Sequence, residues 1–174
     1  MQRRLTVPCA IMNAVFPNPL QFDLAGLADA MADCHEADAL RCRFSPQQWA
    51  VLASFLQPMA MTAGQVLMKK GALDRTVYLI EAGTLSAHYE DEKSRLRMAL
   101  IGAGTVVGEG SFFSHLPRRA TVTASSPCKL WGLNAMRFAE LSNRHCAVAQ
   151  ELTLGMGGVL AKRLYHRQRR VAVT

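Results

Sequence analysis

Glycine recurs at short intervals between residues 59 and 133, and the runs between the glycines are short and rich in β-forming side chains. Because glycine accepts the backbone conformations of tight turns, this spacing is typical of turns between strands rather than of long helices. Strands are expected at residues 66–68, 77–81, 85–89, 97–101, 120–124 and 129–133. Many short strands with glycine turns favour a sandwich or a barrel-like roll.

Apolar residues at helical spacing precede this β-rich stretch. Residues 23–41 form the first such segment, and Asp23 is its expected N-cap. A second helix is expected to begin at Ser45 and Pro46 and to end before Pro58, because serine is favoured at the N-cap and proline at the first helical position.

Helical spacing resumes after the β-rich stretch, where Asn134 is the expected N-cap. The last helix is expected from about residue 145 to residue 167. Gly155, Gly157 and Gly158 lie inside it, and each costs roughly 1 kcal/mol relative to alanine. They indicate a flexible joint, a close contact between helices, or simple fraying.

Composition excludes several classes of protein. Half of the residues are hydrophobic, which is too many for a disordered chain. No apolar run approaches the ~20 residues that a membrane-spanning helix needs. Residues 1–17 lack the cleavage site of a signal peptide, so a cytoplasmic protein without a membrane partner is expected.

Neither the cysteines nor the histidines lie at the spacings of metal sites, and no serine or cysteine lies in a nucleophile motif. The cysteines are odd in number and none form a C-x-x-C pair, so they are expected to pack as small hydrophobic side chains. We therefore expect no catalytic residues, no metal and no cofactor, and a protein that is not an enzyme.

The formal net charge of +7 suits an anionic partner, whether nucleotide, nucleic acid or acidic protein. Basic residues crowd near the C-terminus, at Lys162, Arg163, Arg167, Arg169 and Arg170. Because cations are favoured at the C-terminal end of a helix, a solvated helix end explains this cluster as well as an anion-binding role does.

Residues 107–122 place a carboxylate between two glycines and then two arginines at the start of a strand. Gly108 and Gly110 allow backbone N–H groups to point into a concavity, which attracts phosphate. The planar fork of Arg118 grips phosphate oxygens, and an ionised Glu109 accepts hydrogen bonds from a sugar hydroxyl. This pattern predicts an anion pocket; the alternative is a surface ion pair between Glu109 and one arginine, worth about 0–1 kcal/mol.

The spacing of these residues resembles the cyclic nucleotide-binding family, which includes catabolite-activator-type regulators, kinase regulatory subunits and gated channels. The resemblance covers about residues 44–170 and rests on segments that keep their register together. The segments are Gly64-x-x-Leu67-x-x-x-Gly71, Val77-Tyr78-Leu79-Ile80-x-x-Gly83-x-Leu85, Ile101-Gly102-x-Gly104-x-x-Val107-Gly108-Glu109, Pro117-Arg118-Arg119-Ala120-Thr121-Val122 and Leu160-Ala161-Lys162-Arg163-Leu164.

The resemblance implies an α+β fold that is mainly β: a double-stranded β-helix, also described as a β-roll or jelly roll, with N-terminal helices and a C-terminal helix as a lid. It divides the chain into a partly helical N-terminal extension, residues 1–43, and a nucleotide-binding domain with its C-terminal helices, residues 44–174.

By the same resemblance, residues 108–120 form a phosphate-binding cassette in which Glu109 takes the ribose 2′-hydroxyl and Arg118 the cyclic phosphate. Tyr165 and Arg167 are candidates for contact with the base, and packing of Tyr165 against the roll is the alternative. The expected ligand-binding residues are Gly108, Glu109, Gly110, Ser111, Arg118, Arg119 and Ala120.

The expected function is that of a regulatory sensor of a cyclic nucleotide, with cyclic AMP as the first candidate. Binding would move the C-terminal helix, and a protein partner or a homodimer formed through that helix would respond. Arg119 keeps cyclic di-GMP open as the ligand.

Two different functions also remain open: a ligand-free scaffold for protein interaction, and a truncated Crp/Fnr-type transcription regulator. Only four residues follow Arg170, which leaves no room for a helix-turn-helix, so specific DNA binding is not expected.

Overall fold

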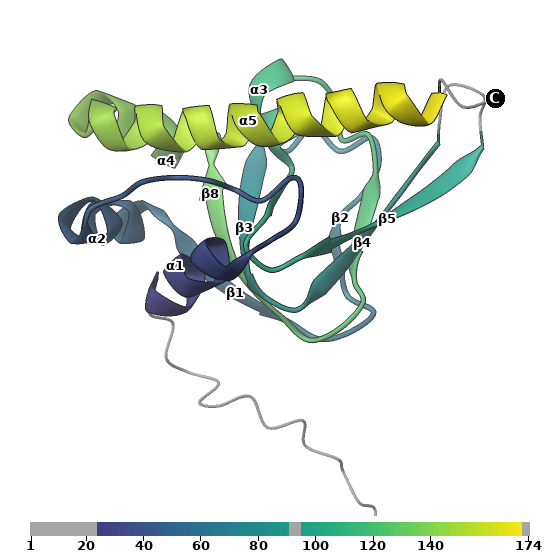
Figure 1. The fold of residues 1–174 in the computed structure, drawn as a ribbon, viewed down its shortest axis with the longest axis horizontal. Coiled ribbons are helices and arrows are strands. Elements are labelled where there is room, and N and C mark those ends of the chain that lie inside the picture. Colours follow the sequence, from purple (N-terminus) through teal and green to yellow (C-terminus); the bar gives the residue numbers. More distant parts are fainter. Residues whose placement is uncertain (1–23, 91–94, 172–174) are drawn as a thin grey trace, which may run out of the picture.

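The computed structural model describes residues 24–90 and 95–171 of the chain, with side chains through His166 in the last helix. The strands of this part form two antiparallel four-stranded sheets, in the orders β1-β8-β3-β6 and β2-β7-β4-β5 (Figure 1). Their bounds are β1 Gln57–Met61, β2 Val66–Met68, β3 Thr76–Ala82, β4 Thr84–Glu90, β5 Leu96–Gly102, β6 Val106–Val107, β7 Thr121–Ala124 and β8 Cys128–Asn134. The expected mainly-β roll with helices at both ends is confirmed.

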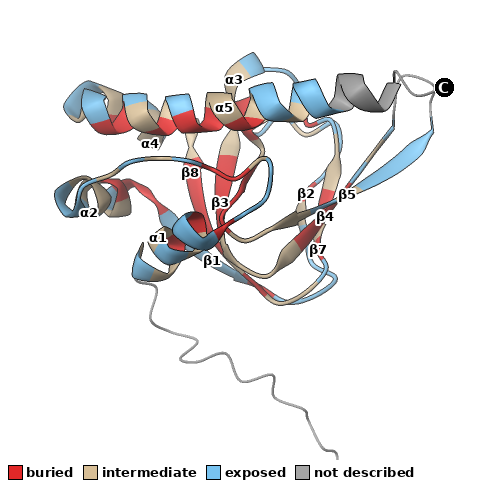
Figure 2. Ribbon diagram, viewed as in Figure 1, coloured by how far each residue is buried: buried red, intermediate tan, exposed pale blue. Residues whose placement is uncertain are grey.

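Strand β3 lies between two hydrophobic clusters, one on each of its faces. Val77 and Leu79 pack into a cluster shared with the helices, whereas Tyr78 and Ile80 pack into a second cluster between the two sheets. Successive side chains of a strand point to opposite faces, and a strand covered on both faces is apolar throughout. The continuous apolar run 77–80 is therefore buried on both sides (Figure 2).

Helix α1 spans Leu24–Asp33 and is shorter than the segment 23–41 that its spacing predicts. The helix ends where the Arg41 side chain turns back and donates to the carbonyl oxygens of Met31, at 3.3 Å, and Cys34, at 2.6 Å. Residues 34–43 then run without further helix, and we name them the strap. The expected N-cap, Asp23, lies outside the described residues.

Helix α2 spans Pro46–Phe55 and begins as predicted. The Ser45 hydroxyl accepts from the backbone N–H of Gln48 at 3.3 Å, and the Gln48 side chain accepts from the N–H of Ser45 at 2.8 Å. This reciprocal capping satisfies two donors that the helix itself leaves unpaired.

Helix α3 spans Glu109–Ser114, α4 spans Ala135–Arg144, and α5 spans Cys146–Val171. The predicted N-cap of α4 is confirmed, since the Asn134 side chain accepts from the N–H of Arg137 at 2.9 Å. Helix α5 lies across one end of the roll and packs against α4, α2 and α3 (Figure 1). It therefore contacts the helix with which the predicted cassette begins.

Within the described ranges, no helix has both the length and the apolar character needed to cross a membrane.

Candidate functional site

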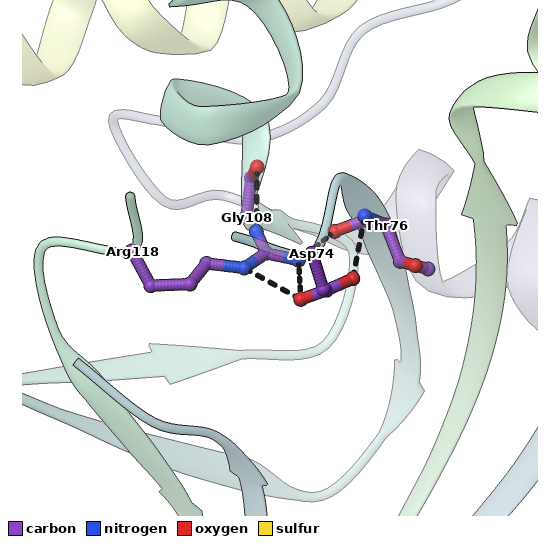
Figure 3. A network of polar contacts seen from close by, with 4 residues as sticks. All are labelled: Asp74, Thr76, Gly108 and Arg118. Atoms are coloured by element: carbon purple, nitrogen blue, oxygen red, sulfur yellow. Dashed lines mark hydrogen bonds and ion pairs between the residues drawn. The ribbon is translucent and has the colours of Figure 1, made fainter. Parts of the chain in front are cut away.

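Arg118 is held inside the protein by a network of polar contacts, although it is an arginine in a connecting segment (Figure 3). Only 2% of the residue is exposed. Its Nε and Nη2 donate to Oδ2 of Asp74 at 2.8 and 2.6 Å. Nη1 donates to the carbonyl oxygen of Gly108 at 3.0 Å, and Nη2 also donates to that of Thr76 at 2.5 Å. These bonds fix the plane of the guanidinium group.

Backbone pairing brings Asp74 to this arginine across a long stretch of sequence. The N–H of Arg118 donates to the carbonyl of Ala72 at 2.8 Å, and the N–H of Gly71 donates to the carbonyl of Arg118 at 2.8 Å. Asp74 is further oriented by the N–H of Thr76, which donates to its Oδ1 at 2.9 Å. Burial works to raise the pKa of Asp74, but the hydrogen bonds from Thr76 and Arg118 outweigh it and lower that pKa.

Gly108 is the residue that lets the guanidinium of Arg118 lie against the start of α3. It adopts φ 92°, in the left-handed region that favours glycine. A Cβ atom there would lie 2.6 Å from Nη1 of Arg118 and 2.7 Å from the carbonyl oxygen of Thr76. Any other residue at position 108 would therefore push the arginine out of its place.

The first turn of α3 leaves backbone donors unused by the helix. The N–H of Phe112 donates to the carbonyl of Gly108 at 3.2 Å, and this is the first intrahelical bond. The N–H groups of Glu109, Gly110 and Ser111 precede it, and the Gly108 N-cap has no side chain to accept from them. The segment thus combines backbone donors with a buried guanidinium.

Glu109 begins α3 and is ion-paired, but with neither of the two arginines that follow it in the cassette. Its side chain is 10% exposed, and its Oε1 accepts from Nη1 of Arg163 on α5 at 2.8 Å. Nε of Arg163 donates to Oδ2 of Asp38 in the strap at 2.6 Å. Burial works to lower the pKa of Arg163, and the charge of Glu109 together with the hydrogen bonds to both carboxylates outweighs it and raises that pKa.

The remaining predicted ligand-binding residues differ in burial. Ser111 is buried in α3, Ala120 is half-buried, and Arg119 is exposed. Gly110 faces open space, with nothing within 4 Å of the position its Cβ would take. Position 110 therefore tolerates a side chain that position 108 does not.

The two residues predicted to contact the base lie on α5. Tyr165 is 54% exposed, and its ring centroid lies 5.7 Å from that of His166. Arg167 occupies a position whose side chain is outside the described part of the structure.

Sequence reasoning missed the partners of the two central residues. Asp74 follows a glycine turn and carries no motif of its own, and it lies 44 residues from Arg118. Arg163 was visible as one member of a basic cluster and of the segment 160–164, but without a partner or a role, and Asp38 was visible only as part of an expected helix. A charge pattern on α5 could have indicated an acidic partner, but not which one.

The described side chains include no group of three or more His, Cys, Asp or Glu residues placed to hold a metal ion. The site around α3 consists instead of guanidinium groups, backbone N–H groups and a carboxylate. Such donors are suited to bind an anion, and the carboxylate is suited to accept from a hydroxyl group.

The chain is similar to known proteins over about half of its length. The family model described as the cyclic nucleotide-binding domain matches residues 58–145, just over half of the chain. The cAMP-dependent protein kinase regulatory subunit of Yarrowia lipolytica is 29% identical over 86 residues, which cover 49% of this chain and 22% of that protein. A cyclic nucleotide-gated potassium channel of Rhizobium etli is 31% identical over 97 residues, or 56% of this chain and 26% of the channel. The chain thus spans about a quarter of the length of these curated relatives.

Solved structures share the fold. A cyclic nucleotide-binding domain from Methylobacillus flagellatus has a TM-score of 0.74 at 20% identity, and the match covers 85% of this chain and 82% of that one. The Catabolite Activator Protein of Thermus thermophilus has a TM-score of 0.63 at 23% identity, covering 74% of this chain and 59% of that one. From the family match and this shared roll, the chain belongs to the cyclic nucleotide-binding domain family, a family of regulatory ligand-binding domains.

Proposed function

We propose that this protein is a regulatory sensor that binds a cyclic nucleotide, with cyclic AMP as the first ligand to test. The single observation that carries the proposal is the position of Arg118. The residue is only 2% exposed, and its guanidinium group lies against the N-terminal end of α3, where the N–H groups of Glu109, Gly110 and Ser111 precede the first intrahelical bond. A guanidinium fork beside free backbone donors is suited to bind a phosphate monoanion.

Binding would require Arg118 to exchange some of its present partners. A guanidinium group has five N–H donors, and four hydrogen bonds join Arg118 to protein acceptors. Asp74 accepts two of the four, and its side chain is 44% exposed. A phosphate would compete with this carboxylate, and water can solvate Asp74 as it withdraws.

Glu109 supplies the second half of the proposed site. Its residue is 7% exposed and stands at the first position of α3, where an ionised carboxylate can accept from the ribose 2′-hydroxyl. The kinase regulatory subunit whose name includes cAMP supports the choice of this nucleotide. We propose a role in binding rather than in catalysis.

Signalling is proposed to pass through α5 to a partner surface. The exposed side chains of Leu154, at 65%, and Tyr165, at 54%, lie close to one face of the helix because they are separated by about three turns. An apolar face of this kind can receive a second copy of the chain, which sedimentation equilibrium with and without nucleotide would detect.

Titration calorimetry of the full chain against cyclic AMP, cyclic GMP and cyclic di-GMP tests the proposal. Wild type is expected to bind at least one of them, and Arg118→Ala is expected to bind it at least about tenfold more weakly, because a charged hydrogen bond to phosphate is lost. Arg144→Ala is the matched control, since this exposed arginine on α4 pairs with Glu140 instead. Circular dichroism establishes that each variant is folded. Equal affinity in wild type and Arg118→Ala would remove Arg118 from the site.

One observation favours a second candidate function, a scaffold that binds protein and no nucleotide. Both members of the predicted pair already have protein partners, Asp74 for Arg118 and Arg163 for Glu109. The same calorimetry distinguishes the two functions, because a scaffold would bind none of the three nucleotides.

A further inference from the structure

Arg163 is the point at which three separate parts of the chain meet. It lies on α5, it donates to Glu109 of the cassette at 2.8 Å, and it donates to Asp38 of the strap at 2.6 Å. The bridging side chains are largely buried, with 25% of Arg163, 10% of Glu109 and 29% of Asp38 exposed. Ion pairs shielded in this way are screened less by salt than pairs on the open surface.

The two halves of α5 are held by different means. Its first half packs apolar side chains into the main core, and Leu152, Met156 and Val159 are each at most 1% exposed. Between residues 161 and 166, Arg163 is the one residue that is not exposed. Over residues 161–166, the attachment of the helix therefore comes from this polar bridge more than from burial of apolar surface.

The strap is tied to the first half of α5 as well. The N–H of Arg43 donates to Oε1 of Glu151 at 2.6 Å. Gly155 allows the strap and α5 to approach closely, since a Cβ atom there would lie 2.5 Å from Sγ of Cys42 and 2.9 Å from the carbonyl oxygen of Arg41.

The strap also contacts the roll, where the N–H of Leu40 donates to the carbonyl of Gly104 at 3.0 Å. Asp38 is therefore a fixed anchor for Arg163.

We propose that Arg163 is a latch that holds the distal half of α5 over the cassette, and that the sugar hydroxyl of a nucleotide opens it by competing for Glu109. This inference rests on the proposed function, because it assigns the competitor to the same site. It makes Arg163 a residue that lowers nucleotide affinity, and it gives the strap a role in the response of the helix.

The bridge is suited to open because it is incomplete. Nη2 of Arg163 is buried and has no hydrogen-bond partner among the described residues. A buried donor without a partner destabilises the closed arrangement relative to one in which the guanidinium reaches water. A ligand shifts such an equilibrium only through its different affinities for the two states, and competition for Glu109 supplies that difference.

The coupling between latch and ligand must be reciprocal. If the nucleotide opens the latch by taking Glu109, then removing the latch must strengthen nucleotide binding. If Arg163 instead contacted the nucleotide, removing it would weaken binding. The sign of the change therefore separates a latch from a ligand contact.

The test compares Arg163→Gln with Arg144→Gln in the full chain, using hydrogen exchange read by mass spectrometry without added nucleotide. Arg144→Gln is the matched control because it breaks an exposed ion pair on α4, between Arg144 and Glu140. In Arg163→Gln, amide exchange over residues 160–166 is expected to be about tenfold faster, while exchange over residues 148–156 stays unchanged, because only the distal half loses its charged hydrogen bonds. Asp38→Asn is expected to have a smaller effect in the same segment.

Calorimetry with cyclic AMP then gives the sign of the coupling. Arg163→Gln is expected to bind several-fold more tightly than wild type. Glu109→Gln is expected to loosen the same part of α5 but to bind more weakly, since it also alters the acceptor for the sugar.

Two results would overturn the latch and leave the proposed function standing. The first is unchanged amide exchange over residues 160–166 in Arg163→Gln, and the second is that wild type binds cyclic AMP and Arg163→Gln binds it more weakly. If neither wild type nor Arg163→Gln binds cyclic AMP, cyclic GMP or cyclic di-GMP, both the proposed function and the competition for Glu109 are overturned.

Discussion

Gly108 and Gly110 flank the same carboxylate, yet the structure predicts opposite responses to replacement by alanine. At position 108 the backbone has φ 92°, and the new Cβ would lie 2.6 Å from Nη1 of Arg118 and 2.7 Å from the carbonyl oxygen of Thr76. At position 110 the backbone is helical, and nothing lies within 4 Å of the new Cβ. Comparing the two substitutions therefore distinguishes a specific need for glycine at position 108 from a general sensitivity of this segment to substitution.

The magnitude for Gly108→Ala has two parts. Holding alanine in the left-handed region costs about 1–2 kcal/mol, and displacing neighbouring groups from a packed site costs about 1–3 kcal/mol. The free energy of unfolding should therefore fall by about 2–5 kcal/mol. Gly110→Ala should change stability little, or raise it by up to about 1 kcal/mol, because alanine is the better helix former.

Urea unfolding followed by tryptophan fluorescence measures both variants, and Trp131 is a suitable reporter because it is only 4% exposed. Calorimetry with cyclic AMP should show weaker binding by Gly108→Ala, since Arg118 would be displaced. A Gly108→Ala protein within about 0.5 kcal/mol of wild type, with a normal m-value, would refute the packing described for Arg118.

Two further predictions concern titrating groups. The native pKa of Asp74 is lowered from 3.8, so its ionised form contributes stability above that pH, and this stability is lost as the pH falls through the native value. In acid unfolding, the stability difference between wild type and Asp74→Asn should therefore be constant near neutral pH and shrink below about pH 4. A difference that grows on acidification would contradict this. Burial, with the charge of Glu151 as a lesser cause, raises the pKa of Cys42 to about 12. Iodoacetamide at pH 8 should therefore modify Cys42 far more slowly than the exposed Cys146, which peptide mass spectrometry would measure. Equal rates of modification would contradict the burial of Cys42.

The roll itself could be predicted from the sequence because its signals are local. Glycine turns and short apolar runs located the strands at 66–68 and 77–81 to within a residue, and capping preferences located the starts of α2 and α4. Strands β1 and β6 were not predicted from the sequence. Strand β6 has only two residues, which is too short for an alternating or apolar strand pattern to be recognised.

The first helix was predicted too long because helical spacing says nothing about tertiary contacts. Leu40 continues the spacing begun in α1, but it is buried in the core by the strap, whose backbone bonds to Gly104 of the roll instead of continuing the helix. Local propensity is a weak prior that such contacts override.

The candidate site was predicted in part. Residues near one another in sequence, such as Gly108, Glu109 and Arg118, share one motif and could be found together. Asp74 and Arg163 could not, because each reaches the cassette only through folding, from 44 residues away in one case and 54 in the other.

The central claim is that Glu109 holds the sugar of a nucleotide whose phosphate is bound beside Arg118. Its most direct test is a cycle of four calorimetric affinities: wild type and Glu109→Ala, each with cyclic AMP and with its 2′-deoxy analogue. The account predicts that wild type prefers the ribose form by about tenfold or more, and that Glu109→Ala has lost most of that preference, because the charged acceptor of the 2′-hydroxyl is gone. An equal preference in both proteins would contradict the account.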